Sequence, residues 1–255
     1  VDFPFEPIAG AVLETGCIAP ASVAKLDNSL FWIGRDRRGG PTVWRSEGFT
    51  ARRISTHPVE LALVDQIATL PDAIAYAFVD TGHPVYHIFL ASGTSWRYDV
   101  STGAWHEVAE WSGTAYKPHP TRCHAYYGDG HVLGSIDSNV LYRQSPEVYY
   151  YRGNLIRRER TCPHLTNENK RTFYTALELD METGVGNVAS VNPVIQLAWS
   201  NDGGYTYSAF RSQPIGAAGA YPRVRWNRLG SARNRIFRVV LTEPVNAVIT
   251  NAYFE

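Results

Sequence analysis

"AIAYAFVDTGHPVYHIFLA", Ala73 to Ala91, is followed by "GTSWRYDVSTGAWHEV", Gly93 to Val108, and together these stretches decide the fold. Each stretch holds two apolar segments of strand length, separated by Thr-Gly-His-Pro in the first and Ser-Thr-Gly in the second. Such turn residues between alternating apolar segments are typical of antiparallel hairpins. The span therefore predicts two consecutive β-hairpins.

The same pattern recurs along the chain with a fixed period. Another pair of hairpins is predicted by "SVAKLDNSLFWIGRD", Ser22 to Asp36, and "PTVWRSEGFTARRIST", Pro41 to Thr56. Two markers repeat at separations of 46 to 52 residues. An aromatic-Arg pair occurs at Trp44-Arg45, Trp96-Arg97 and Tyr142-Arg143. A Gly-His pair in a turn occurs at Gly82-His83 and Gly130-His131. Four strands per repeat of this length indicate propeller blades.

One stretch departs from the strand pattern. In "STHPVELALVDQIATL", Ser55 to Leu70, residues Leu61, Val64 and Ile67 or Ala68 have helical spacing, and Pro58 suits a first turn. We expect a helix from Pro58 to about Ala68, inserted between blades. The predicted fold class is all-β, a complete or partial β-propeller with one short inserted helix. We expect residues 1–255 to form a single propeller-like domain, the C-terminal part of a longer chain, with a candidate sub-boundary near 165–190.

Composition narrows the functional classes. The chain has 255 residues, 44% of them hydrophobic and 19% charged, so it can bury a full core. Equal numbers of basic and acidic residues, 24 each, argue against a dedicated binder of nucleic acid or of anionic membranes. Cys17, Cys123 and Cys162 have no disulfide or zinc spacing and are expected to be small buried hydrophobes. No apolar run approaches the length of a membrane span.

The stretch "WSNDGGYTYS", Trp199 to Ser208, resembles an Asp box, a hairpin signature of many propellers. We expect a structural turn at a blade edge, in which carboxylate and hydroxyl groups satisfy the hairpin backbone and glycines take positive φ. The residues assigned to it are Ser200, Asp202, Gly204 and Thr206.

The last third of the chain is rich in arginine. Arg223 and Arg225 alternate with Val224 and Trp226, which predicts a strand with one basic face and one buried face. Because arginine is favoured at protein interfaces, we take this set as a candidate interface, with nucleic-acid contact as the alternative. It comprises Arg223, Arg225, Arg228, Arg233, Arg235 and Arg238.

No catalytic, cofactor-binding or metal-binding residue is predicted. His83 and His87 have the spacing of a helical zinc pair, but the segment reads as a strand and holds Pro84. A retaining glycosidase would need two carboxyl groups about 5 Å apart. No sequence spacing pairs the available carboxylates, which include Asp99, Glu107, Asp129, Asp137, Glu178 and Asp180.

Several ordered stretches resemble the phage stabilisation protein family, the packaged-DNA stabilisation or tail-hub proteins of short-tailed bacteriophages. They are "ETGCIAPASVAKLDNSLFWIGRD", "SEGFTARRISTHPVE", "GHPVYHIFLASGTSWRYDVSTGAWHE", "WSNDGGYTYS" and "RVRWNRLGSARNRIFRVVLTEPV". The resemblance implies a β-propeller protein of the virion tail, made in the bacterial host cytoplasm, that prolongs and seals the DNA channel without catalysis or cofactors.

The resemblance further implies a ring of six copies that contacts the tail adaptor and the tail needle or fibre proteins. DNA would pass without sequence-specific binding, and no membrane is involved. The alternative from the residues themselves is a glycan-binding or sialidase-like propeller enzyme. Such an enzyme would present a central pocket with clustered arginines, a tyrosine and two acids.

Overall fold

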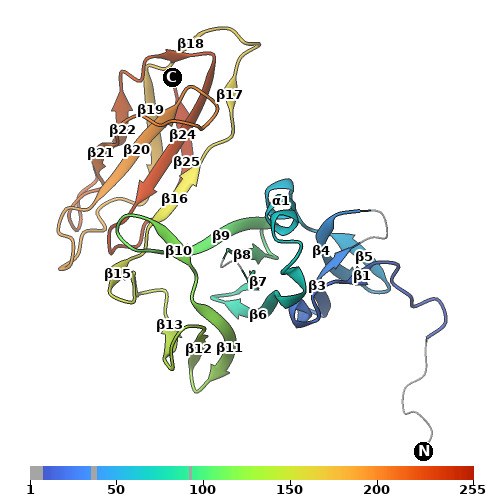
Figure 1. Ribbon diagram of the computed structural model, residues 1–255. Helices are drawn as coiled ribbons and strands as arrows, with labels where there is room; N and C mark the ends of the chain where they lie inside the picture. The colour runs from blue at the N-terminus through green and yellow to red at the C-terminus, as the bar shows by residue number, and fades with distance from the viewer. Residues whose placement is uncertain (1–7, 36–38, 92–93) are drawn as a thin grey trace, which may run out of the picture. The chain divides into compact units, whose positions relative to one another are not determined.

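The computed structural model describes residues 8–35, 39–91 and 94–255, which fold mostly as antiparallel strands (Figure 1). The chain divides into two compact units, residues 1–145 and 146–255. The sequence predicts a single domain with a candidate sub-boundary near 165–190, whereas the structure divides between residues 145 and 146. Strand patterns look alike on both sides of the division, and only the separate hydrophobic cores distinguish the units.

The first unit contains three antiparallel sheets. The first sheet has the order β1-β3-β4-β5, with β2 also paired to β3. Its strands are β1 (Gly16–Cys17), β2 (Ala24–Leu26), β3 (Ser29–Arg35), β4 (Pro41–Glu47) and β5 (Thr50–Arg53). Asp27 and Asn28 join β2 to β3, and both have positive φ, 49° and 52°, as a two-residue turn of type I′ requires. The predicted hairpins of this stretch are confirmed.

The second and third sheets follow the same up-and-down path. The second has the order β10-β9-β8-β7-β6, and the third has the order β11-β12-β13. Their strands are β6 (Ile74–Asp80), β7 (His83–Phe89), β8 (Ser95–Asp99), β9 (Ala104–Trp111), β10 (Tyr116–Pro118), β11 (Thr121–Tyr127), β12 (Gly130–Ser135) and β13 (Leu141–Gln144). The two hairpins predicted from Ala73 to Val108 are β6–β7 and β8–β9, so this prediction is confirmed.

The predicted repeat corresponds to equivalent strands. The aromatic-Arg pairs lie on β4, β8 and β13, each the third strand of the run that begins at β2, β6 or β11. Each Gly-His pair lies at the turn between the first and second strands of its run. The period of 46 to 52 residues therefore marks one sheet per repeat, which confirms the blade-like organisation.

The inserted helix is confirmed as α1 (His57–Asp65), but the apolar residues with helical spacing are not the ones that it buries. Val59 and Leu63 are buried, whereas Leu61 and Val64 are about half exposed. The segment is apolar on both sides, so helical spacing alone does not select the face that packs. Contact with the core of the first two sheets selects Val59 and Leu63. Two short 3-10 turns complete the unit's helical segments, at Pro20–Ser22 before β2 and at Leu70–Asp72 between α1 and β6.

Two hydrophobic clusters hold the three sheets together. The larger joins the first and second sheets through side chains such as Phe31 and Tyr86, whose rings stack at 5.2 Å between centroids. The Tyr86 hydroxyl also donates to the Ser22 carbonyl at 2.7 Å. The smaller cluster joins the second and third sheets and contains Tyr76, Phe78, Val85, Leu133 and Tyr142.

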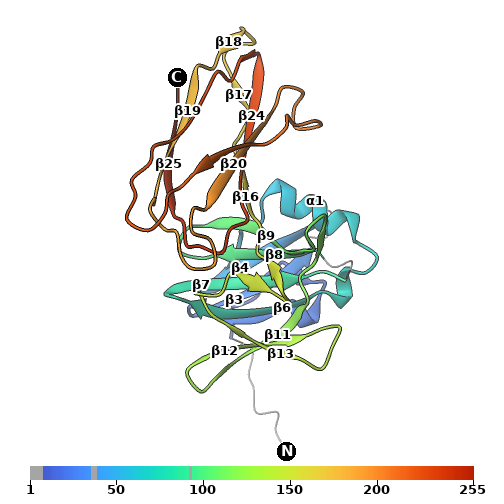
Figure 2. The same cartoon turned by 90° about the vertical axis from the view of Figure 1, so that its left-hand side faces the viewer.

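The second unit is a two-layered β-structure (Figures 1 and 2). One sheet has the order β16-β24-β20-β21, with β17 also on β24, and the other has the order β22-β19-β25. Two small ladders, β14-β15 and β18-β23, complete it. The strands are β14 (Tyr150–Tyr151), β15 (Asn154–Leu155), β16 (Arg158–Thr161), β17 (Leu165–Thr166), β18 (Thr172–Phe173), β19 (Ala176–Met181), β20 (Val194–Ser200), β21 (Arg211–Pro214), β22 (Val224–Asn227), β23 (Ser231–Ala232), β24 (Asn234–Leu241) and β25 (Ile249–Phe254).

The inner faces of both sheets supply the core of the second unit. Leu177 and Trp226 come from one sheet, and Leu197 and Phe237 come from the other. This arrangement is that of a β-sandwich. Within the described residues of the chain, no helix is long and apolar enough to cross a membrane.

Candidate assembly interface

Arg225 of β22 and the preceding Arg223 belong to an ion-pair network on the outside of the sandwich. Val224 and Trp226 are buried, and Arg223 and Arg225 lie on the opposite face, as the alternation predicts. Arg223 donates to the Glu178 carboxylate at 2.9 and 2.6 Å, and Arg225 bridges Glu178 at 3.1 Å and Glu255 at 2.7 Å. The hydrogen bond from Arg223 is the main cause that lowers the pKa of Glu178. These two guanidinium groups are therefore already matched by carboxylates.

Arg238 is held within its own sheet. Its guanidinium lies over the Tyr207 ring, 3.5 Å from the centroid, and its Nε is 3.0 Å from the Glu159 carboxylate. Glu159 is also paired with Arg157, at 3.0 Å. Arg238 thus covers a neighbouring aromatic ring rather than projecting freely.

Arg235 is not part of an exposed face. Its side chain is 1% exposed and lies among aromatic rings, 4.6 Å from the Tyr174 centroid and 5.6 Å from the Trp199 centroid. It donates to the Asn201 side chain at 2.8 Å and to the Leu229 carbonyl at 2.9 Å. Burial lowers its pKa. The expectation that Arg235 contributes to an interface is wrong, because β24 turns this position inward.

Arg228 and Arg233 are exposed, and no ion pair holds either one within the described residues. Arg228 has a positive φ of 59° in the turn that follows β22. The register of β18 with β23 brings a third exposed arginine, Arg171, beside them. Sequence reasoning missed Arg171, because only this pairing connects the 166–173 segment with the 228–233 turn.

The Asp-box stretch connects β20 to β21 in the sandwich, so its expected place at a blade edge is wrong. The Asp202 carboxylate accepts from the Thr206 amide at 3.0 Å and from the Thr206 hydroxyl at 2.5 Å. The Ser200 hydroxyl donates to Asp202 at 2.6 Å and accepts from the Gly204 amide at 2.9 Å. Gly203 and Gly204 both have positive φ. The bonds to Ser200 and Thr206 lower the pKa of Asp202, and all of these groups serve the turn.

Histidine rings pack between the second and third sheets of the first unit. His87 stacks on Tyr76 at 4.7 Å between centroids, and His124 stacks on Phe78 at 4.3 Å. His124 Nε2 lies 2.8 Å from His131 Nδ1. Neither ring nitrogen of the buried His87 has a hydrogen-bond partner among the described residues.

Burial is the main cause that lowers the pKa of each shifted histidine in this cluster. The pKa of His87 is well below its usual value, and that of His119 falls to about 4. The pKa of His124 is also lowered, with His131 as a further cause. Across the described parts of the chain, no group of three or more His, Cys, Asp or Glu side chains is arranged to hold a metal ion.

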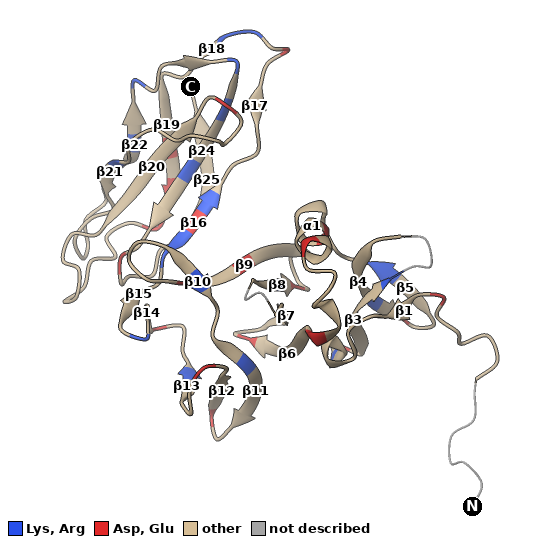
Figure 3. Cartoon of the chain, in the orientation of Figure 1, with Lys and Arg blue, Asp and Glu red and all other residues tan. Residues whose placement is uncertain are grey.

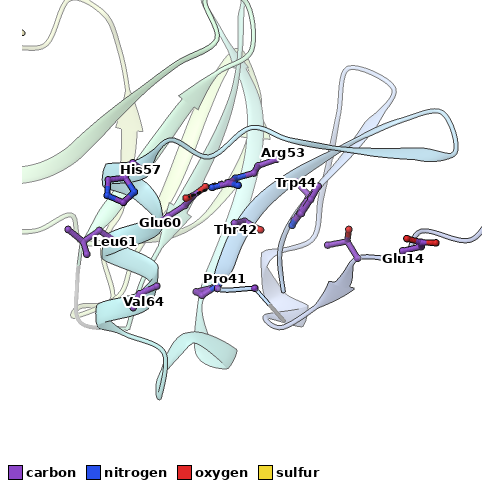
Figure 4. A pocket seen from close by; sticks show the side chains of 12 residues that line it. Glu14, Pro41, Thr42, Trp44, Arg53, His57, Glu60, Leu61 and Val64 are labelled. Atoms are coloured by element: carbon purple, nitrogen blue, oxygen red, sulfur yellow. Dashed lines mark hydrogen bonds and ion pairs between the residues drawn. The ribbon is translucent and has the colours of Figure 1, made fainter. Parts of the chain in front are cut away.

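A cavity of about 520 Å³ lies beside α1 in the first unit (Figure 4). In the close-up, Trp44 and Arg53 come from the first sheet and face α1, which supplies His57 and Glu60. Arg53 and Glu60 form a two-bonded ion pair, with Nε donating to the carboxylate at 2.7 Å, and the Ser55 hydroxyl donates to the same carboxylate. Among the described residues that line the cavity, Arg53 is the only arginine and there is no tyrosine.

The remaining candidate carboxylates either have hydrogen-bond or ion-pair partners or are divided between the two units. Asp99 accepts from His83 and from the Ser101 and Thr102 amides, and Asp129 pairs with Arg143. Glu107 and Asp137 also lie in the first unit, whereas Glu178 and Asp180 lie in the second.

The cysteines differ from expectation. Cys17 and Cys123 are exposed and Cys162 is half buried, and all three are free thiols. The expectation of small buried hydrophobes is therefore wrong for Cys17 and Cys123. Cys17 lies on β1, which is exposed, and Cys123 lies on β11, which is mostly exposed, and sequence spacing does not reveal this.

Comparison with known families gives two consecutive matches. Residues 1–149 match the phage stabilisation family described as bacteriophage P22 Gp10, beta-propeller, and residues 157–255 match the family described as bacteriophage P22 Gp10, beta-sandwich. No curated protein matches the chain. The two matches correspond to the repeated sheets of the first unit and to the sandwich of the second. The chain thus belongs to the bacteriophage P22 Gp10 family and is a structural protein of the phage tail.

Proposed function

We propose that this protein is a non-enzymatic tail-hub component of a short-tailed phage or prophage, which prolongs the DNA channel and seals it after packaging. The observation that carries the proposal is the succession of both Gp10 family matches along one chain. The protein would form a ring, with six copies by family resemblance, in contact with the tail adaptor and with needle or fibre proteins. Its place of action would be the virion tail.

The internal construction of both units supports a structural role. Stacked antiparallel sheets with separate apolar cores are rigid supports, which suits a channel wall. The polar groups that would be candidates for chemistry serve turns or ion pairs instead, as Asp202 and Glu178 do. Exposed arginine and aromatic side chains, such as Arg233 and Tyr221, are the residue types that protein interfaces favour.

The mass of the assembled particle tests this proposal. Light scattering on the full chain, alone and mixed with the adaptor protein of the same phage, is expected to show a ring or a stoichiometric complex. Cryo-electron microscopy of the virion would then locate the ring on the tail. A chain that stays monomeric alone and with adaptor, needle and fibre proteins would overturn the tail-hub proposal.

The cavity beside α1 is the candidate pocket for the glycan-directed alternative. Arg53, the one arginine among the described residues of its lining, is bound to Glu60 and so is not free to hold an anionic sugar. Fluorogenic glycosides and a glycan array test this alternative directly. Turnover or specific binding that Trp44→Ala abolishes would favour it over the structural role.

A further inference from the structure

The β18–β23 ladder lies at one end of the sandwich (Figures 1 and 3). Arg171 immediately precedes β18, and Arg228 and Arg233 stand before and after β23 in the chain. Thr172 pairs with Ala232, so the preceding Arg171 lies across from Arg233. Arg171 donates to the Ser231 hydroxyl at 3.2 Å. The Arg228 amide donates to the Thr175 carbonyl at 2.8 Å, which fixes the neighbouring turn. We refer to Arg171, Phe173, Arg228 and Arg233 as the sandwich tip.

The tip arginines differ from the other arginines of the candidate interface set, because they are both exposed and without a carboxylate partner among the described residues. Arg223, Arg225 and Arg238 are ion-paired, and Arg235 is buried. No ion pair is formed by Arg171, Arg228 or Arg233 in the described regions, and all three are exposed. The nearby Glu168 carboxylate is paired with Lys170 at 2.5 Å. The tip therefore offers three guanidinium groups free of internal competition.

The charge of the whole unit acts in the same direction. Residues 146–255 hold thirteen Lys and Arg against nine Asp and Glu, a formal net charge of +4. Residues 1–145 hold eleven against fifteen, a net charge of −4, so the zero total conceals two units of opposite sign. Figure 3 shows basic positions at the β18 end of the sandwich, and others along β16 and β24. A polyanion would be attracted to the second unit.

The exposed ring of Phe173 indicates which class of polyanion the tip would bind. Phe173 is 74% exposed between the tip arginines, on the same short strand that follows Arg171. Guanidinium groups bind phosphate oxygens in pairs of hydrogen bonds, and an aromatic ring offers a stacking surface for a base. Arginines with an interleaved aromatic and no adjacent free acid are a combination typical of nucleic-acid contact.

We propose that the sandwich tip binds the phosphate backbone of DNA without sequence specificity. This inference rests on the proposed channel function and deepens it, because it assigns the surface that contacts the DNA. It also moves the contact away from the β22 arginines, which their glutamate partners already neutralise. The second unit thereby supplies a positive contact surface within a protein of zero net charge.

Fluorescence anisotropy of a short labelled duplex, titrated with the full chain at several salt concentrations, tests the proposal. The triple variant R171A/R228A/R233A is expected to weaken binding at least about tenfold at low salt, because each lost phosphate contact removes about 0.9 from the salt slope. The matched control is K117A/R122A/R160A. It changes the net charge equally at exposed positions that do not belong to the tip, none of which forms an ion pair within the described residues.

The control variant is expected to bind DNA as the unsubstituted chain does, and equal weakening by both triple variants would overturn the tip assignment. F173A distinguishes base stacking from phosphate contact. It should weaken binding of a single-stranded oligonucleotide and leave duplex binding nearly unchanged. An unsubstituted chain that forms its ring but does not bind the duplex would overturn the inference and leave the tail-hub function standing. Loss of the ring in the tip variant, with DNA binding retained, would assign the tip to an acidic protein surface instead.

Discussion

His124 Nε2 lies 2.8 Å from His131 Nδ1, so one ring nitrogen must donate a hydrogen bond and the other must accept it. The pair therefore cannot hold both rings in the charged form in this arrangement. The pair lies between the second and third sheets, where His87 and His119 also pack against each other at 5.3 Å between centroids. Docking of the third sheet consequently depends on neutral histidines.

We predict that acid destabilises the first unit. The folded-state pKa values of His87, His119 and His124 are lowered from 6.5 by burial, so the unfolded chain binds more protons once the pH falls below about 6.5. Stability is complete above that pH and is lost progressively toward pH 4, by about 1–2 kcal/mol for a group such as His119 between pH 7 and 5. Urea unfolding at several pH values measures this loss.

Substitution distinguishes the histidine cluster from general acid effects. H87F keeps a ring against Tyr76 and removes the buried nitrogens, so the pH-dependent loss should shrink. H164Q, in the second unit, is the control and should leave it unchanged. Hydrogen exchange should show the earliest acid-induced opening in residues 121–144, and uniform opening of both units would contradict the prediction.

The repeated sheets predict unequal effects of three equivalent aspartates. Asp27, Asp80 and Asp129 each pair with the arginine of the repeated aromatic-Arg marker. Only Asp80 also accepts from Gln144, at 2.6 Å, and its arginine partner is largely buried. We expect D80A to lower the unfolding free energy by about 1–2 kcal/mol, and D27A and D129A by about 0.5 kcal/mol or less. Equal losses in urea unfolding would refute the distinction.

The aromatic rings around Arg235 lead to a prediction for the stability of the sandwich. R235A removes contacts to three aromatic rings and two hydrogen bonds, so we expect a loss of about 2–4 kcal/mol in unfolding free energy. R235M refills the volume and should lose less than R235A. Tryptophan fluorescence during urea unfolding reports on Trp199 and Trp226 in this core. A loss in R235A no larger than in the exposed-site variant R233A would contradict this account.

The Asp-box turn should respond locally. D202A removes the acceptor for the Thr206 amide and hydroxyl, so the amides of Gly204 and Thr206 should exchange hydrogen several-fold faster. T206S keeps the hydroxyl and is the matched control. Assembly of the ring should be unaffected by either change, and a selective loss of assembly in D202A would indicate an interface role for the turn.

By itself, the sequence determined the hairpins, the repeat and the family. Asp27, Asn28 and Gly82 are residue types that tolerate the positive φ they adopt, so the turns and strand limits can be read locally. The arginines at positions 45, 97 and 143 recur because each repeat builds the same third strand. Ordered short stretches along the whole chain then identified the family.

Only the tertiary structure decided which side of each element is buried and which distant groups meet. Arg233 and Arg235 are identical residues two positions apart, yet one is exposed and the other lies in an aromatic cage, because β24 enters the sandwich between them. Helix α1 has two apolar sides, and packing against the sheets selected Val59 and Leu63. Arg171 joined Arg228 and Arg233 through strand pairing across about 60 residues of chain, a long-range contact that no local steric rule encodes.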